Sequence, residues 1–243
     1  MKSQHEVLIL GSGSGSNAEE IVKYAQSNKL PIKFIGGCNK APGKAGIYER
    51  LQKLGVEVKH MPSNDDFAAI REFLLKNPEV QLTALAGYMM FLPDDMVADN
   101  DIINIHPSIF PLYQGSKDAY ADAIEAGDYY SGATVHKATS DHDAGPVIAQ
   151  LAFERSEFWD LDTFRQIGLS HEHAFYPIVL ANRAMGAEKG LDMEKIAATA
   201  QKNLEQRDLP VATTIIPANG TSKFNGFDAK SFDARFMKRY SGR

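Results

Sequence analysis

The sequence predicts an α/β protein with a mostly parallel sheet, helices on both faces and a mixed sheet at the C-terminal side. Short apolar runs alternate with amphipathic segments over the first hundred residues, as expected for successive βαβ units. A glycine-rich turn directly follows the first apolar run, which is where such sheets bind ligands. Further along, a short polar loop separates two strand-like runs, and this spacing indicates an antiparallel hairpin.

Composition limits the class of protein. The chain has 243 residues, a net charge of −5 and no run of 18 apolar residues, so we expect no membrane span and no general attraction to nucleic acid or membranes. Cys38 is the only cysteine, which excludes an internal disulfide and a cysteine-based metal site. The first six residues carry no apolar signal region, and together these features indicate the cytoplasm. The length allows a main domain over 1–190 and a C-terminal extension over 191–243.

The first strand and the turn after it form a candidate anion site. Residues 7–10 are continuously apolar, as in a strand covered on both faces, and residues 18–25 have helical periodicity. Ser16 with Glu19 three positions later forms a capping-box pattern, so the helix is expected to begin there. The free N–H groups and the positive end of the helix dipole then meet at the glycine-rich turn.

The same turn admits two functional interpretations. Gly13, Gly15 and Ala18 satisfy a G-x-G-x-x-A dinucleotide fingerprint, which also requires an acidic residue after the second strand. Residues 37–40, which follow the strand at 32–36, contain no acid, so a single phosphomonoester is favoured over a dinucleotide. A tight β–α turn without a ligand remains the structural alternative. The residues expected to hold the phosphate are Gly13, Ser14, Gly15, Ser16 and Asn17.

The alternation of elements continues along the chain. Expected helices cover 41–54, 65–76, 118–126, 160–186 and 193–206, and expected strands cover 56–60, 82–86, 101–106, 132–139, 147–152 and 211–216. This order gives a Rossmann-like sheet whose crossovers are right-handed and whose ligands lie at the carboxyl ends of the strands. The apolar, partly aromatic turn at 87–93 lies at that edge and suits a flat heterocycle.

Asn104 and His106 are the candidate catalytic pair. They lie two residues apart in an expected strand, so their side chains share one face, and Pro107 then ends the strand. An amide donor beside an imidazole suits acyl transfer, which needs a group to hold an oxyanion and a group to move a proton. A structural histidine at the end of a strand is the simpler alternative.

Two polar segments allow further interpretations. His136, Asp141, His142 and Asp143 could suggest a metal site, but a solvated loop with one functional acid is the more common arrangement, and we expect no metal. In the basic tail, Phe232, Phe236 and Tyr240 lie four residues apart, as on one face of a helix. We expect this tail to pack on the domain, with a contact to an anionic partner as the alternative.

Several motifs, taken in order, resemble those of the folate-dependent formyltransferases. The matching segments are Gly-Ser-Gly-Ser-Asn at 13–17, Leu-Ala-Gly-Tyr-Met at 85–89, Asn-Ile-His-Pro-Ser at 104–108, Gly-Ala-Thr-Val-His at 132–136, Asp-x-Gly-Pro-Val-Ile-x-Gln at 143–150 and Glu-His-x-x-Tyr-Pro at 172–177. The resemblance covers about residues 5–185 and implies the formyltransferase fold.

The resemblance also implies an activity and its residues. Asn104, His106 and Asp143 would be catalytic, and Glu172 would contact the ribose of the acceptor. The formyl donor would be 10-formyltetrahydrofolate, the acceptor would be the primary amine of glycinamide ribonucleotide, and no metal would take part. The implied folate-binding residues are Tyr88, Met89, Met90, Phe91, Leu92, Val97, Thr139, Ser140, Asp141 and His142. The resemblance further suggests a cis bond between Phe110 and Pro111.

Several positions depart from the family pattern, and other functions remain open. Met90, Gln114, Ala144 and the segment 116–118 differ from the residues usual in the family. They leave open a relative that acts on another amine or on water, and a dinucleotide-binding protein is the alternative from another class. We expect small-molecule partners only, with no nucleic acid and no membrane, and a monomer or homodimer.

Overall fold

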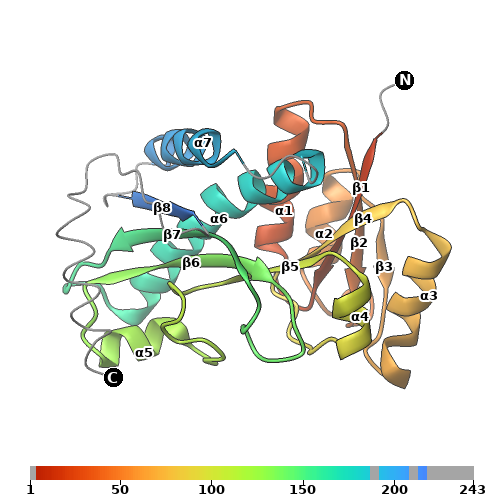
Figure 1. Cartoon of the computed structure of the whole chain (residues 1–243), viewed down its shortest axis with the longest axis horizontal. Helices are drawn as coiled ribbons and strands as arrows, with labels where there is room; N and C mark the ends of the chain where they lie inside the picture. Colours follow the sequence, from red (N-terminus) through yellow and green to blue (C-terminus); the bar gives the residue numbers. More distant parts are fainter. Residues whose placement is uncertain (1–3, 187–191, 208–212, 218–243) are drawn as a thin grey trace.

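The computed structural model describes residues 4–186, 192–207 and 213–217, which form one eight-stranded mixed sheet with helices on both faces (Figure 1). The strands are β1 His5–Gly11, β2 Ile32–Cys38, β3 Val58–His60, β4 Val80–Leu85, β5 Ile102–His106, β6 Tyr130–Lys137, β7 Val147–Glu154 and β8 Thr213–Pro217. The helices are α1 Ser16–Ser27, α2 Ile47–Lys53, α3 Ala68–Lys76, α4 Asp94–Asp99, α5 Ala119–Glu125, α6 Leu161–Gly186 and α7 Met193–Gln206, with a 3-10 turn at Asp65–Phe67.

The strand order confirms the predicted fold class. It runs β3-β2-β1-β4-β5-β6-β7-β8, and the first five strands are parallel. β6, β7 and β8 then continue the sheet in antiparallel pairs. The order reverses between β1 and β4, which places the carboxyl ends of both strands beside a crevice suited to ligands.

Two apolar layers lie on opposite faces of the sheet because side chains alternate along β1. Val7 and Ile9 belong to a core cluster that includes residues of α1, α2, α5, α6 and α7. Leu8 and Leu10 belong to a second cluster with residues of α3 and α4. The central strands are therefore covered on both sides, as the continuous apolar run at their start predicted.

α6 is the longest helix in the part of the chain that the structure describes, and it connects the two halves of the sheet. It lies against α1 and α7 and reaches strands β1, β4, β6 and β7 (Figure 1). The hydroxyl of its buried Tyr176 donates to the carbonyl oxygens of Leu85 (3.1 Å) and Ile103 (3.3 Å), close to the carboxyl ends of β4 and β5. The helix is thereby fixed against the strands that carry the candidate site.

Two helical predictions were wrong in detail, and one short helix was not predicted. The helix expected over 41–54 begins only at Ile47, because Pro42, Gly43 and Gly46 favour the turns that precede it. The helix expected over 65–76 is interrupted, since Asp65, Asp66 and Phe67 have positive φ angles of 50°, 53° and 59°. The short helix α4 was not anticipated.

The capping-box prediction for α1 was also wrong. The helix does begin at Ser16, but its N-cap is Gly15 in a left-handed conformation, and no side chain caps it. Glu19 instead forms ion pairs with Lys23 (2.8 Å) and Arg50. Glycine at the cap provides a φ of 77° that other residues rarely adopt.

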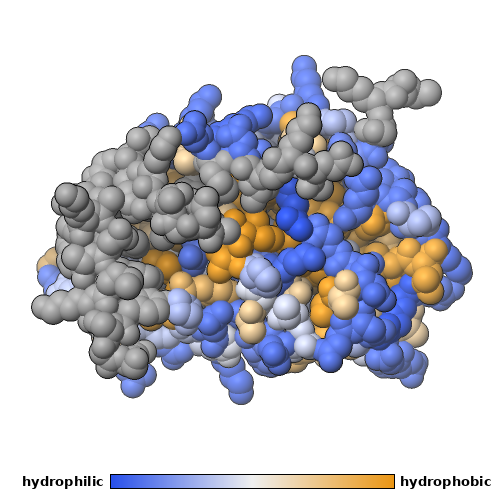
Figure 2. Space-filling model, in the orientation of Figure 1, coloured by the Kyte–Doolittle hydropathy of each residue, from blue (hydrophilic) through white to orange (hydrophobic). Residues whose placement is uncertain are grey.

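Two expectations concern surfaces beyond the sheet. No helix among the described residues is long and apolar enough to cross a membrane. Apolar residues on the face in Figure 2 appear as separate patches between hydrophilic ones. The basic tail with Phe232, Phe236 and Tyr240 lies outside the described residues.

Candidate active site

A cavity of about 810 Å³ lies where the loops after β4 and β5 meet the loop between β6 and β7. Its walls also include α5, α6 and the first turn of α1, which contributes Asn17. All three predicted catalytic residues line it. Lys117 and Arg165 also line the cavity, the latter in an ion pair with Asp118, and the sequence analysis assigned neither of them a role.

The alternation along β5 directs the two catalytic candidates toward the cavity. Ile103 and Ile105 belong to the core cluster shared with α1 and α6, so Asn104 and His106 point to the other face. Nδ1 of His106 lies 2.9 Å from Oδ2 of Asp143. Two side chains that are 37 positions apart in the sequence therefore meet directly, and no bridging water is required.

Both ring nitrogens of His106 face oxygen atoms. Besides the contact to Asp143, Nε2 lies 2.9 Å from the carbonyl oxygen of Tyr113. Only the doubly protonated imidazolium ring can donate to both acceptors at once. A substrate oxygen would have to replace the carbonyl oxygen of Tyr113 in order to accept from Nε2–H.

Asp143 is held on several sides. Its Oδ2 accepts from the backbone N–H of Gly115 (3.2 Å), and its Oδ1 lies 3.3 Å from Nδ2 of Asn104 and 3.4 Å from Nε2 of His136. Burial raises the pKa of this carboxyl, but the hydrogen bonds and charges of His106 and His136 outweigh it and hold the pKa well below its ordinary value. Asp143 is therefore a carboxylate at neutral pH.

His136 is a neighbour of Asp143 to which the sequence analysis gave no role of its own, although it weighed the residue as a metal ligand and as part of the matching segment 132–136. β6 pairs with β5 in a register that places His136 opposite Asn104. Its imidazole is 2 % exposed and contacts Asp143. The short loop between β6 and β7 predicts that these two strands form a hairpin. It does not predict that β5 is the neighbour of β6 on the other side.

Glu172 of α6 also lines the cavity. Its carboxylate accepts from Nδ2 of Asn17 (2.8 Å) and from the hydroxyl of Tyr120 (3.0 Å). Burial raises its pKa, although both hydrogen bonds act in the opposite direction. The structure thus joins two residues that the sequence analysis predicted separately, one in the glycine-rich turn and one on the distant helix α6.

The predicted phosphate loop is only partly in the cavity wall. Asn17 lines the cavity, whereas Gly13, Ser14, Gly15 and Ser16 do not. A Cβ atom at Gly13 would meet nothing within 4 Å, so the backbone at this position is open to a ligand.

The predicted folate-binding residues form most of a second wall. Lining residues among them are Tyr88, Met89, Met90, Phe91, Leu92, Thr139, Asp141 and His142. The rings of Phe91 and His142 lie 3.6 Å apart between centroids, so the two loops touch across the cavity. Val97 and Ser140 do not line it. Val97 lies in α4 and packs against the second core cluster.

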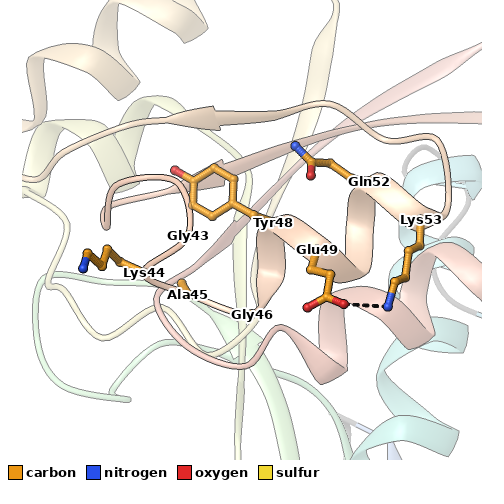
Figure 3. Close-up of a pocket in the computed structure, with 8 residues that line it drawn as sticks. All are labelled: Gly43, Lys44, Ala45, Gly46, Tyr48, Glu49, Gln52 and Lys53. Carbon is orange, nitrogen blue, oxygen red and sulfur yellow. Dashed lines mark hydrogen bonds and ion pairs between the residues drawn. The ribbon is translucent and has the colours of Figure 1, made fainter.

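A second cavity, of about 760 Å³, lies along α2 and shares no lining residue with the first. Figure 3 shows its side chains, among them Tyr48 and the ion pair between Glu49 and Lys53 (2.6 Å). No sequence motif points to it, and we assign it no site. Within the ranges that the structure describes, no group of three or more His, Cys, Asp or Glu residues is arranged to hold a metal ion.

Comparisons with known proteins identify the class. The family model described as formyl transferase matches residues 5–180. The chain belongs to the formyl transferase family. This agrees with the mixed sheet and with the cavity at the carboxyl ends of its parallel strands.

Relatives within the family include phosphoribosylglycinamide formyltransferases and a glycinamide ribonucleotide transformylase. The phosphoribosylglycinamide formyltransferase of Bacillus subtilis (strain 168) is 35 % identical over 185 residues, which cover 71 % of this chain and 91 % of that protein. The glycinamide ribonucleotide transformylase 1 of Symbiobacterium toebii has a TM-score of 0.69 at 31 % identity, covering 76 % of this chain and 90 % of that one. The phosphoribosylglycinamide formyltransferase of Anaplasma phagocytophilum has a TM-score of 0.69 at 26 % identity, over 93 % of this chain and 96 % of that one.

Proposed function

We propose that this protein transfers a formyl group from 10-formyltetrahydrofolate to the primary amine of glycinamide ribonucleotide, a step of purine biosynthesis. The carrying observation is the direct contact between His106 and Asp143 beside Asn104, in a cavity of a formyl transferase fold. The names of the relatives support the choice of acceptor.

The three side chains suit the chemistry of direct transfer. The amine attacks the formyl carbon, and negative charge develops on the formyl oxygen, where Asn104 and protonated His106 are the donors. Asp143 keeps the imidazolium in place through its 2.9 Å contact. Because its pKa is held so low, Asp143 is a weak base while His106 is charged. Asp143 becomes a stronger base once His106 gives its proton to the formyl oxygen, and only then does it take up the proton of the amine through a water.

The two walls of the cavity suit two different ligands. The apolar, partly aromatic wall at Tyr88–Leu92 suits the flat ring system of a folate. Asn17 and Glu172 suit the phosphate and ribose of a nucleotide, and Lys117 offsets part of the charge of anionic substrates. We expect the open backbone at Gly13 to approach the phosphate most closely.

The wider setting follows from the same proposal. Residues 1–190 form the formyltransferase domain, and residues 191–243 form a C-terminal extension. The protein works in the cytoplasm with small-molecule partners, as a monomer or homodimer, and without a metal.

The test is formyl transfer by the purified full-length chain, followed by the absorbance of the folate product. We expect transfer that depends on both substrates. Asn104→Ala, His106→Ala and Asp143→Asn should each lower kcat by about 10²–10³-fold while glycinamide ribonucleotide still binds, because each removes a group that acts on the reacting atoms. Lys53→Ala, at an exposed ion pair on α2, is the control and should leave kcat unchanged.

Three results would contradict the proposal. Unchanged kcat in the His106 or Asp143 variants would remove the mechanism. Transfer to another amine but not to glycinamide ribonucleotide would change the acceptor. Tight binding of NAD or NADP without folate binding would favour the dinucleotide-binding alternative.

A further inference from the structure

Three side chains form a row across the sheet beside the catalytic candidates. His106 on β5 lies opposite Thr134 on β6, and Thr134 lies opposite Gln150 on β7. Side chains directly opposite each other in neighbouring strands point to the same face of a sheet. His106 lines the cavity, whereas Thr134 and Gln150 do not. Any effect of these two residues on the reaction must therefore pass through a neighbouring group.

The backbone that leaves β5 folds over this row and is hydrogen-bonded to it. The N–H of Phe110 donates to Oε1 of Gln150 (2.6 Å) and lies 3.1 Å from Oγ1 of Thr134. The hydroxyl of Thr134 has two acceptors within reach, the carbonyl oxygen of Ser108 (2.7 Å) and Oε1 of Gln150 (2.8 Å). Ser108, Phe110 and Thr134 are buried. Removing the side-chain oxygen of Thr134 or of Gln150 would thus leave buried backbone groups poorly paired, which is costly.

The same stretch of backbone reaches the imidazole of His106 at two points. The hydroxyl of Ser108 donates to the carbonyl oxygen of Leu112 (2.7 Å), and the next carbonyl oxygen, that of Tyr113, lies 2.9 Å from Nε2 of His106. The ring of Phe110 lies 5.6 Å from that of His106 between centroids. Tyr113 has a positive φ of 56°, a conformation that a tyrosine keeps only where its surroundings hold it.

The contact to Tyr113 fixes the orientation of the His106 ring. Because a carbonyl oxygen can only accept, Nε2 carries a hydrogen whether the ring is neutral or charged. With Nε2 held in this way, Nδ1 stays 2.9 Å from Oδ2 of Asp143. In the proposed reaction the ring is charged, and the formyl oxygen can share the hydrogen of Nδ1 with Asp143 while Tyr113 keeps Nε2. Support for the Tyr113 carbonyl is therefore support for the oxyanion donor.

We propose that Thr134 and Gln150 are positioning residues for His106 in the formyl transfer. They hold the backbone whose Tyr113 carbonyl oxygen keeps the imidazole in contact with Asp143. Without them, this carbonyl would shift and the ring would rotate away from the carboxylate. The inference rests on the proposed function and adds to it the groups that align its catalytic histidine from outside the cavity.

The experiment removes each hydrogen-bonding atom by a substitution of similar size. Thr134→Val and Gln150→Leu should each lower kcat about tenfold, the equivalent of one net hydrogen bond. The KM of both substrates should change by less than about twofold, because neither side chain lines the cavity. Thr134→Ser and Gln150→Glu keep the hydroxyl and the acceptor oxygen and should retain most of kcat. Thr83→Val, the same substitution at a buried position of β4, is the matched control and should leave kcat unchanged.

The double variant Thr134→Val, Gln150→Leu tests whether both residues act through the same backbone. Independent effects would multiply to a loss of about 100-fold. A shared route predicts a loss well below that product, because the first substitution already releases the backbone at Phe110.

Three outcomes would overturn the inference. A kcat within about twofold of the wild type in both single variants would show that His106 does not depend on these residues. Equal losses in Thr134→Ser and Thr134→Val would show that the hydroxyl is not what matters. A double variant that loses the full product would show that the two residues act separately.

Proton NMR of the full-length chain separates this inference from the proposed function, because it needs no turnover. The Nε2–H of His106, assigned by its absence in His106→Ala, should exchange slowly with water, since it is buried against a carbonyl oxygen. Thr134→Val and Gln150→Leu should broaden or remove this signal, and Thr83→Val should not. An unchanged signal in the double variant would refute the positioning role even in an active enzyme. If the wild-type chain shows no formyl transfer at all, the proposed function fails, and the NMR result still decides how His106 is held.

Discussion

At the scale of single residues, the site depends on one carboxylate that two imidazoles share. Asp143 lies in a left-handed backbone conformation with a φ of 50°, which aspartate tolerates better than most residues. The side-chain amide of Gln114, in the loop after β5, donates to the backbone oxygen of Asp143 (2.8 Å). This hydrogen bond holds Asp143 in its unusual conformation. The low pKa of Asp143 links catalysis to stability, because the folded state favours the ionised form.

This link predicts a pH dependence for Asp143→Asn. A carboxyl whose pKa is lowered by folding stabilises the protein above its unfolded pKa of about 3.9, and that stability is lost as pH falls through the folded value. The variant should therefore be less stable than the wild type by about 1–3 kcal/mol near pH 6, and the difference should shrink below about pH 4. Urea unfolding at several pH values measures it. A constant difference across that range would mean that the Asp143 charge is not the cause.

The roles at β5 could be anticipated from the sequence, whereas the role at β6 could not. Asn104 and His106 are two residues apart before a proline, so local alternation already placed them together. His136 reaches the same point only through pairing between strands that are about 30 residues apart. That register depends on the packing of the whole sheet, and the matching segment 132–136 does not by itself show which strand lies beside it.

At the scale of elements, the glycine-rich turn combines two different requirements. Gly15 needs its left-handed φ of 77°, and a Cβ there would lie 2.5 Å from Cα of Ile47 on α2. Gly13 has neither restriction, since a Cβ there would meet nothing within 4 Å. One glycine therefore serves the packing of α1 against α2, and the other leaves the approach to the turn open.

A pair of alanine substitutions separates these requirements. Gly15→Ala should lower the free energy of unfolding by at least about 1–2 kcal/mol, because alanine must adopt a left-handed conformation and displace α2. Gly13→Ala should leave stability nearly unchanged and raise the KM for glycinamide ribonucleotide more than the KM for the folate. Urea unfolding and steady-state kinetics of both variants provide the measurements. An equal effect of Gly13→Ala on both KM values would place the phosphate elsewhere.

Elements that consist of clear apolar runs could be predicted, whereas elements whose ends are set by turns could not. β1, β2 and α6 lie within a few residues of their expected ranges, since their apolar side chains match the buried faces. The start of α2 follows a turn in which Gly43 has a left-handed φ of 78°, and the break before α3 depends on the left-handed backbone at Phe67. Local propensity gives little warning when a residue such as phenylalanine adopts a positive φ.

At the scale of the whole molecule, the described part of the C-terminal region contributes to the main core. Ile196, Ala200 and Leu204 of α7 are almost fully buried in the cluster that covers one face of the sheet. Arg207 pairs with Glu20 of α1 (2.5 Å), and β8 extends the sheet by pairing with β7. The extension therefore stabilises the domain that it follows, although its boundary remains a proposal.

Truncation tests this contribution. A chain that ends at residue 190 should lose about 3–6 kcal/mol of stability. It lacks Ile196 and Leu204, so the core residues that they cover become exposed, and it lacks β8, so the edge of β7 becomes unpaired. A chain that ends at residue 207 keeps α7 and should lose much less. Urea unfolding of both chains, with formyl transfer measured below the transition, compares them. Equal stability of the shorter chain and the full chain would make the extension an independent appendage.

Tyr176 and Glu172 lie one turn apart on α6, and this spacing has a consequence for the size of the acceptor. The tyrosine hydroxyl binds the backbone of β4 and β5, while the glutamate faces Asn17 in the cavity. The helix therefore fixes the distance between the strand ends and Glu172. If Glu172 contacts the ribose of the acceptor, as proposed, an acceptor one bond longer or shorter would bring its amine to the wrong depth relative to the main-chain atoms of β4 and β5.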